Sequence, residues 1–127
     1  MKVSKSHEDY LEAIVELGGS TEQAVRSVDI AKKMGVSKAS VNKALSLLKE
    51  KSFLDQPYYG DATLTPAGYE YGCKIVERHN LLVAFMEKVL GVPADMAEEE
   101  AHVMEHAISD DSFEKWTEYI RRLGIEY

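Results

Sequence analysis

Apolar residues recur at helical spacing along most of the chain, and alternating, β-type runs occur in one short region. The pattern predicts helices over 6–18, 27–34, 38–51, 66–90, 94–106 and 113–123. The expected N-caps are Ser6, Ser27, Ser37, Thr65 and Ser112. Residues 53–65 predict two short strands around Gly60-Asp61. The chain is therefore expected to be mainly α.

The helices over 27–34 and 38–51 are joined by a short turn that contains Gly35, which is the pattern of a helix-turn-helix. Apolar residues at i, i+4 and i+7 predict one buried face on the second helix. The residues of this face are Val41, Leu45 and Leu48. In this motif the N-terminal end of the second helix enters the major groove. An ordinary helical hairpin with a lysine-rich solvent face is the alternative.

The segment after the helix-turn-helix favours a winged DNA-binding module over that alternative. The predicted hairpin over 53–65 follows directly, and Thr65 and Pro66 then begin the next helix as its N-cap and first residue. Small and amide side chains can reach base edges, whereas lysines contact phosphates. The residues expected to contact double-stranded DNA are Arg26, Ser37, Lys38, Ala39, Ser40, Asn42, Lys43 and Tyr59.

The formal net charge of −7 argues at first sight against a nucleic-acid partner, but the charge is unevenly spread. Residues 26–51 contain seven basic and two acidic side chains, whereas residues 61–127 contain six basic and 14 acidic ones. A polyanion would therefore be bound by the first segment. The acidic second segment suits a cation.

Length and composition limit the class of protein further. A chain of 127 residues with 45% hydrophobic residues can form one domain or two small ones with a real core. No stretch approaches the roughly 20 apolar residues that cross a bilayer, and no signal-peptide core follows the N-terminus, so a cytoplasmic protein without a membrane partner is expected. The single cysteine, Cys73, fits a reducing compartment. No phosphate-binding glycine loop is present, and no organic cofactor is expected.

Candidate metal ligands lie near the end of the helix predicted over 94–106. His102, Glu105 and His106 stand at i, i+3 and i+4, so all three are expected on one face. Imidazole and carboxylate groups that converge in this way suit a first-row divalent metal. Two other interpretations stay open on the spacing alone. The residues could form a solvated face, or His-x-x-Glu-His could be the inverted zinc-protease signature.

Five motifs, taken in order, resemble the diphtheria-toxin-repressor family of metal-dependent transcriptional repressors. These are Ser-His-Glu-Asp-Tyr-Leu-Glu at 6–12, Val-Ser-Lys-Ala-Ser-Val at 36–41, Leu-Thr-Pro-Ala-Gly at 64–68, Glu-Arg-His-Asn-Leu-Leu at 77–82 and Glu-Ala-His-Val-Met-Glu-His at 100–106. The chain is similar to the short manganese-type branch, which lacks a third, SH3-like domain. The resemblance implies a winged helix-turn-helix domain over 1–68 and an all-helical metal-binding and dimerisation domain over 69–127. The resemblance also implies that the protein is not an enzyme.

Position by position, the resemblance also implies a set of metal ligands. They are Asp9, Glu12, His79, His102, Glu105 and His106. The main departure is His102, where the iron branch has cysteine and the manganese branch glutamate. Mn²⁺ or Fe²⁺ is the expected metal, and the added imidazole would also suit Zn²⁺, Co²⁺ or Ni²⁺. Val83 and Glu98 replace the glutamate and histidine of the iron-type second site, so that site is not expected to be intact; one metal ion or two remain open.

The expected function is a repressor that binds operator DNA as a homodimer when loaded with metal and controls metal uptake or homeostasis genes. Without metal, crowded carboxylates repel, and two unit charges about 4 Å apart cost on the order of 4 kcal/mol at an effective dielectric near 20. A divalent ion reverses that repulsion and shifts the population towards the DNA-competent form. The alternative is a winged-helix transcription factor that is metal-independent or senses a small molecule.

Overall fold

The computed structural model describes residues 2–55 and 61–127, and it divides into two compact units, Met1–Lys74 and Ile75–Tyr127. The division falls within the long helix α4 (Pro66–Ala84), so each unit receives part of that helix. The boundary expected after residue 68 lies within the same helix. No helix in the described part of the chain has an apolar run long enough to span a membrane.

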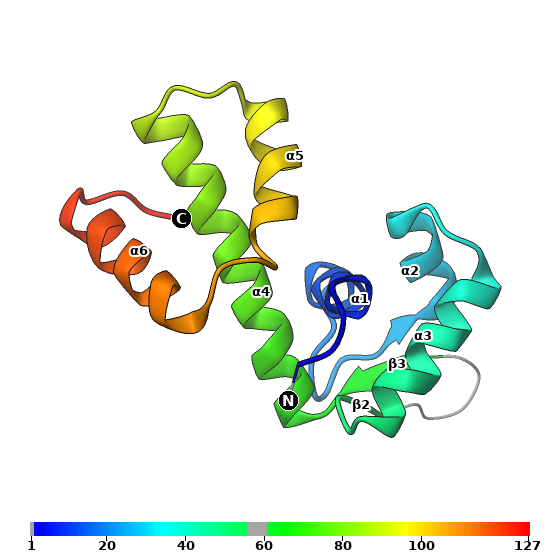
Figure 1. Cartoon of the computed structure of the whole chain (residues 1–127). Coiled ribbons are helices and arrows are strands. Elements are labelled where there is room, and N and C mark those ends of the chain that lie inside the picture. Colours follow the sequence, from blue (N-terminus) through cyan, green and yellow to red (C-terminus); the bar gives the residue numbers. More distant parts are fainter. Residues whose placement is uncertain (1, 56–60) are drawn as a thin grey trace. The chain divides into compact units, whose positions relative to one another are not determined.

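The first unit is a winged helix-turn-helix, as the pattern predicts (Figure 1). Its elements in chain order are α1 (Lys5–Glu16), β1 (Val25–Arg26), α2 (Ser27–Met34), α3 (Lys38–Glu50), β2 (Leu54–Asp55), β3 (Asp61–Leu64) and the first part of α4. The strands form an antiparallel sheet in the order β1-β3-β2. Strand β1 lies between the helices predicted over 6–18 and 27–34, where the sequence pattern predicts no strand. Two residues are too short to display alternation, and only pairing with β3 defines this strand.

The turn between α2 and α3 has the local chemistry that the sequence predicts. Gly35 adopts a left-handed conformation with φ 66° and ends α2. Ser37 then caps α3, because its side chain accepts a hydrogen bond from Ser40 N. Two expected caps in this unit are wrong, one by two residues and one by a single residue. Ser4, not Ser6, caps α1, and α2 begins at Ser27 itself with Arg26 in the cap position.

The core of the first unit comes from one face of each helix and the inner face of the sheet. Its largest side chains have almost no exposed surface: Leu11, Ile14, Ile30, Val41, Leu45, Leu48, Leu54 and Leu64. Helix α4 approaches the segment before β2 so closely that a Cβ atom at Gly68 would lie 1.8 Å from the backbone oxygen of Phe53. This contact explains a glycine in the first turn of a helix, where it is otherwise unfavourable.

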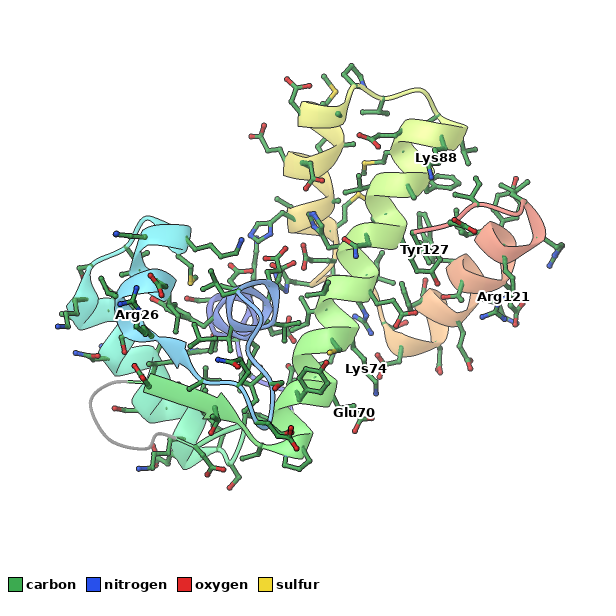
Figure 2. All side chains as sticks on the ribbon, turned by 180° about the vertical axis from the view of Figure 1, so that it is seen from behind. Arg26, Glu70, Lys74, Lys88, Arg121 and Tyr127 are labelled. Atoms are coloured by element: carbon green, nitrogen blue, oxygen red, sulfur yellow. The ribbon has the colours of Figure 1, made fainter. Side chains whose placement is uncertain are left out.

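The second unit is entirely helical among its described residues. It consists of the rest of α4, a π-helical turn η2 (Phe85–Val89), α5 (Ala94–Met104) and α6 (Asp110–Arg122). Its buried apolar residues are Ile75, Leu81, Leu82, Ala84, Met86, Ala97, Ala101 and Ile120. The segment after α6 returns to α4 and η2: Lys88 Nζ donates to Glu126 O at 3.1 Å, and Tyr127 OH donates to Glu77 Oε1 at 3.5 Å. Lys88 and Tyr127 are labelled in Figure 2.

Two helix boundaries in this unit differ from those the sequence predicts. Helix α5 ends at Met104 instead of continuing to 106, so Glu105 is its C-cap and His106 lies in the following turn. Helix α6 begins at Asp110, one turn before the predicted start, because Ser109 and not Ser112 is the residue whose side chain caps it. The first turn of α6 then contains Asp110 and Asp111, whose charges favour a helix N-terminus.

Candidate metal centre and nucleic-acid interface

The second unit brings the histidines and carboxylates of two helices and a turn together. His79 comes from α4, His102 from the last turn of α5, and Glu105 and His106 from the residues directly after it. One ring nitrogen of His79, one of His102 and one carboxylate oxygen of Glu105 all lie within 4.8 Å of one another. The rings of His102 and His106 have centroids 5.8 Å apart, although His106 is no longer helical.

Glu105 lies at the centre of this group. Its side chain has no exposed surface, and Oε1 lies 3.0 Å from His79 Nδ1 and 3.3 Å from His102 Nδ1. Its second oxygen, Oε2, is buried and has no hydrogen-bond partner among the described residues. A buried carboxylate oxygen without a partner is unfavourable, because its hydration is lost and nothing replaces it. Such an oxygen beside two imidazoles fits a cation, so the residues present fit a divalent metal.

Both ring nitrogens of His79 have carboxylate partners. Nδ1 faces Glu105, and Nε2 lies 2.6 Å from Oε2 of Glu98. The pKa of His79 is raised to about 9, chiefly through the hydrogen bond to Glu105; burial, the next largest effect, lowers it, and the contact with Glu98 raises it further. The imidazole is therefore a cation at neutral pH in the metal-free protein. That positive charge occupies the position beside Glu105 that suits a metal.

Glu98 is absent from the set of site residues that the sequence predicts. It is exposed and lies on α5, four residues before His102, so both side chains share one face of the helix. This i, i+4 spacing was the available signal in the sequence. It is weak, because Glu98 is one of three consecutive glutamates, Glu98-Glu99-Glu100, and Glu99 also lies on a face near His102 at i, i+3. Only the position of His79, on another helix, singles Glu98 out.

The remaining two expected ligands belong to the first unit. Asp9 and Glu12 lie on α1, three residues apart and so on one face of that helix. Their carboxylates are the hard oxygen ligands that Mn²⁺ and Fe²⁺ accept. Their role as ligands stays a prediction.

The residues expected to contact DNA lie around the start of α3, and those described there are exposed. These are Ser37, Lys38, Ala39, Ser40, Asn42 and Lys43. Ser37 and Ser40 also bond to each other, with Ser37 Oγ donating to Ser40 Oγ at 3.0 Å, so Ser37 is partly occupied by its capping role. Tyr59 lies outside the described residues.

Arg26, the expected DNA contact from β1, is exposed (Figure 2) and pairs with Asp29. Its Nε and Nη2 atoms donate to the two carboxylate oxygens of Asp29 at 3.0 and 3.2 Å. A surface pair of this kind is worth little, so a phosphate could replace Asp29 at small cost. The Arg26 guanidinium can therefore exchange Asp29 for another anion at the surface of the first unit.

Comparison with known proteins agrees with both halves of this description. The model of the iron-dependent repressor N-terminal DNA-binding domain matches residues 2–62, and that of the iron-dependent repressor metal-binding and dimerisation domain matches residues 65–124. An uncharacterised HTH-type transcriptional regulator of Methanocaldococcus jannaschii is 32% identical over 114 residues, which cover 89% of this chain and 90% of that protein. The transcriptional regulator MntR of Salmonella typhimurium is 32% identical over 92% of this chain and 73% of its own length.

A solved structure of a manganese-dependent transcriptional repressor in complex with manganese is also similar. Its TM-score is 0.77 at 30% identity, and the match covers 93% of this chain and 52% of that one. The chain thus spans about half the length of this solved relative. These proteins are transcriptional regulators, so the zinc-protease interpretation of His102-x-x-Glu105-His106 does not apply. The chain belongs to the diphtheria-toxin-repressor-like family of metal-dependent transcriptional regulators, and it contains both the DNA-binding domain and the metal-binding and dimerisation domain of that family.

Proposed function

We propose that this chain is a cytoplasmic repressor that binds operator DNA as a homodimer when it holds Mn²⁺ or Fe²⁺, and that it controls genes of metal uptake or homeostasis. The single observation that carries the metal part is the buried Glu105 carboxylate, which lies between two histidines and has one oxygen without a partner among the described residues. Manganese in a similar solved repressor supports the choice of metal.

The ligand set that we propose is the one that the family resemblance implies. Its members are Asp9, Glu12, His79, His102, Glu105 and His106. Carboxylate and imidazole ligands without thiolate suit Mn²⁺ and Fe²⁺. The third histidine raises the affinity for Zn²⁺, Co²⁺ and Ni²⁺ as well, since imidazole binds all of these ions. When bound, the ion would supply positive charge that holds mutually repelling carboxylates together.

The DNA-binding surface that we propose is the start of α3 with its flanking residues. Asn42 and Ser40 would meet base edges, whereas Lys38, Lys43 and Arg26 would meet phosphates. Ser37, Ala39 and Tyr59 complete the proposed set. In a two-fold dimer the two recognition helices would need to be about 34–36 Å apart, one turn of DNA, to read both halves of an operator.

Titration of the metal-stripped protein with Mn²⁺, anaerobic Fe²⁺, Co²⁺ and Zn²⁺ tests the proposal. After each titration, binding to the DNA upstream of the protein's own gene is measured with and without the metal. We expect the bound fraction of DNA to rise with metal and to fall again with chelator. Equal DNA binding in the presence of chelator would overturn the metal-dependent part and favour a metal-independent regulator.

A further inference from the structure

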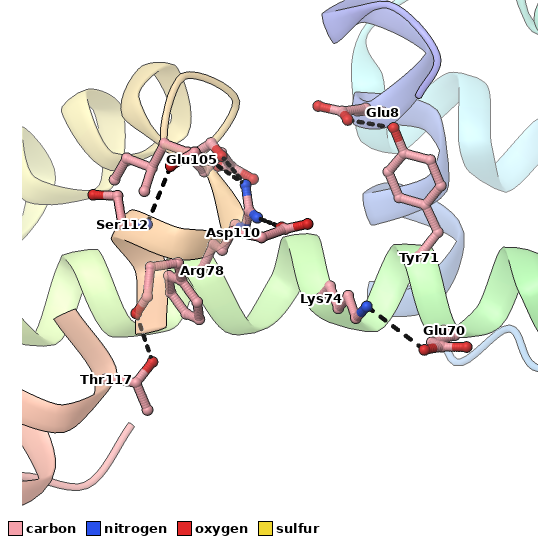
Figure 3. A network of polar contacts seen from close by, with 12 residues as sticks. Glu8, Glu70, Tyr71, Lys74, Arg78, Glu105, Asp110, Ser112 and Thr117 are labelled. Atoms are coloured by element: carbon pink, nitrogen blue, oxygen red, sulfur yellow. Dashed lines mark hydrogen bonds and ion pairs between the residues drawn. The ribbon is translucent and has the colours of Figure 1, made fainter. Parts of the chain in front are cut away.

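Arg78, the residue before His79 on α4, is a buried cation surrounded by the segment that joins α5 to α6. Its Nη1 atom donates to the backbone oxygen of Ile108 at 2.6 Å and lies 3.5 Å from that of Glu105. Its Nη2 atom donates to the carboxylate of Asp110, the first residue of α6 (Figure 3). The side chain of Arg78 is only 11% exposed.

The ring of Phe113 on α6 completes the surroundings of the guanidinium, with Arg78 Cζ 5.4 Å from its centroid. A guanidinium presents several N–H groups in a rigid plane, so one side chain can serve acceptors in different directions. Here the acceptors belong to a turn and to the start of a helix, and all are reached from one position on α4. A lysine ammonium could serve one of these acceptors but could not span them.

The segment that Arg78 holds is the one that carries two of the proposed ligands. Glu105 is the C-cap of α5 and His106 lies in the following turn, so the backbone from 106 to 109 lies between the two helices, tied to α5 by the bond from Ala107 N to Met104 O at 3.0 Å. The bonds from Arg78 reach Glu105 before this stretch, Ile108 within it and Asp110 after it. The backbone of the ligand-bearing turn is therefore tied to α4, the helix that carries His79.

We propose that Arg78 is a positioning residue of the metal centre: it holds Glu105 and His106 at the distance from His79 that a divalent metal ion requires. This inference rests on the proposed metal-dependent function. Arg78 and His79, adjacent on α4, hold the same residue in two ways. The guanidinium is directed to the backbone that follows Glu105, and the imidazole contacts the Glu105 carboxylate. Loss of Arg78 then loosens the ligand geometry without removing a ligand.

The test uses the full chain and the variants Arg78→Gln, Arg78→Lys and Asp110→Asn. Metal-stripped protein is titrated with Co²⁺, whose visible absorption reports the number and geometry of ligands, and with Mn²⁺ for affinity. We expect Arg78→Gln to weaken metal binding about 10- to 100-fold, the usual effect of removing a group that orients ligands, and to alter the Co²⁺ spectrum. Arg78→Lys should also weaken metal binding. Asp110→Asn should weaken it less, because the bonds from Arg78 to the backbone oxygens of Glu105 and Ile108 remain.

Lys88→Met is the matched control. It removes another hydrogen bond from a cationic side chain to a backbone oxygen in the same unit, but it leaves the turn after α5 untouched. We expect wild-type Co²⁺ spectra and affinity for this control. Thermal unfolding of each metal-stripped variant, followed by circular dichroism, shows which proteins are folded at the temperature of the titration.

A purely structural role would lower the unfolding temperature and leave the metal affinity and Co²⁺ spectrum of the folded protein unchanged, and that result in Arg78→Gln would overturn the inference. If Arg78→Gln does not fold, the same criterion is applied to Arg78→Lys, because this variant keeps the positive charge but lacks the planar set of N–H donors. Failure of the wild type to bind any metal is a different result, since it overturns the proposed function itself.

Discussion

The Nδ1 atom of His79 lies 3.0 Å from Oε1 of Glu105, and the Glu105 side chain has no exposed surface. The two residues are 26 positions apart in the chain. Their contact joins α4 to the end of α5 and leaves the second carboxylate oxygen of Glu105 without a hydrogen-bond partner in the described part of the protein. A cation bound between the two side chains would give this carboxylate oxygen the partner that it lacks.

Glu105→Gln and His106→Ala should each abolish metal-stimulated DNA binding while the fold is retained. The glutamine keeps the shape of Glu105 but removes its charge, so we expect Mn²⁺ affinity to fall by more than about 100-fold, beyond the effect of outer-shell changes. Isothermal titration with Mn²⁺ measures the affinity, and circular dichroism checks the fold. A wild-type metal response in both variants would show that these residues are not ligands.

The stability of the metal-free protein should decrease as the pH rises through about 9, because the folded-state pKa of His79 is raised from 6.5 to about 9. The direction follows from the charge of the imidazolium. Its ion pair with Glu105 contributes fully to the free energy of unfolding below pH 6.5, and this contribution is lost as His79 of the folded protein deprotonates. We expect a loss on the order of 2 kcal/mol, measured by urea unfolding at several pH values in chelator. His79→Asn should remove this dependence; if it persists in that variant, another group is responsible.

The same proton should oppose metal binding. A nitrogen of His79 must lose its proton before it can bind a metal, so Mn²⁺ affinity should increase about tenfold per pH unit up to a pH of about 9. Titrations in buffers of different ionisation enthalpy would count the protons released. An affinity independent of pH over this range would show that the metal does not use His79.

Glu98→Gln should lower the pKa of the His79 imidazole, because it removes the charge that faces Nε2. The change should be smaller than for Glu105→Gln, since Glu98 is 60% exposed and solvent screens its charge. NMR titration of the His79 ring in metal-free protein measures it. Glu99→Gln is the control, being an exposed acid on the same helix, and an equal shift in both variants would argue against a specific pair.

Substitutions on α3 should separate phosphate contact from base contact. Lys43→Ala should weaken binding to all DNA sequences and reduce the slope of log affinity against log salt by about one. Asn42→Ala should cost about 1–3 kcal/mol and relax specificity at one base pair. Lys49→Ala, at the exposed C-terminal end of α3, is the control and should change neither. Equal effects of Lys43→Ala and Lys49→Ala on DNA binding would indicate a diffuse electrostatic interaction, and not a helix α3 that contacts DNA with its N-terminal end.

Gly68→Ala should destabilise the first unit, because its Cβ atom would lie 1.8 Å from the backbone oxygen of Phe53. The backbone must move to relieve this overlap, so we expect a loss of at least about 1–3 kcal/mol in urea unfolding. Ala67→Ser, at the exposed neighbouring position, should be close to neutral. A fully stable Gly68→Ala variant would mean that α4 does not approach the hairpin so closely.

The sequence by itself determined most of the local structure. Capping residues, glycines and apolar periodicity lie in contiguous segments, and these signals predict α2 to its last residue and α3 to within one residue. The cluster of His102, Glu105 and His106 was also visible, because one short segment carries all three.

The family resemblance names His79, but only the tertiary structure shows how this distant residue contacts the cluster. The end of α5 at Met104, the contact of Glu98 with His79 and the bonds from Arg78 to the turn before α6 all depend on how α4 packs within the second unit. The pairing of β1 with β3 is of the same kind. These contacts join residues 19 to 37 positions apart, and their energy arises only when the elements are packed, so no local pattern encodes them.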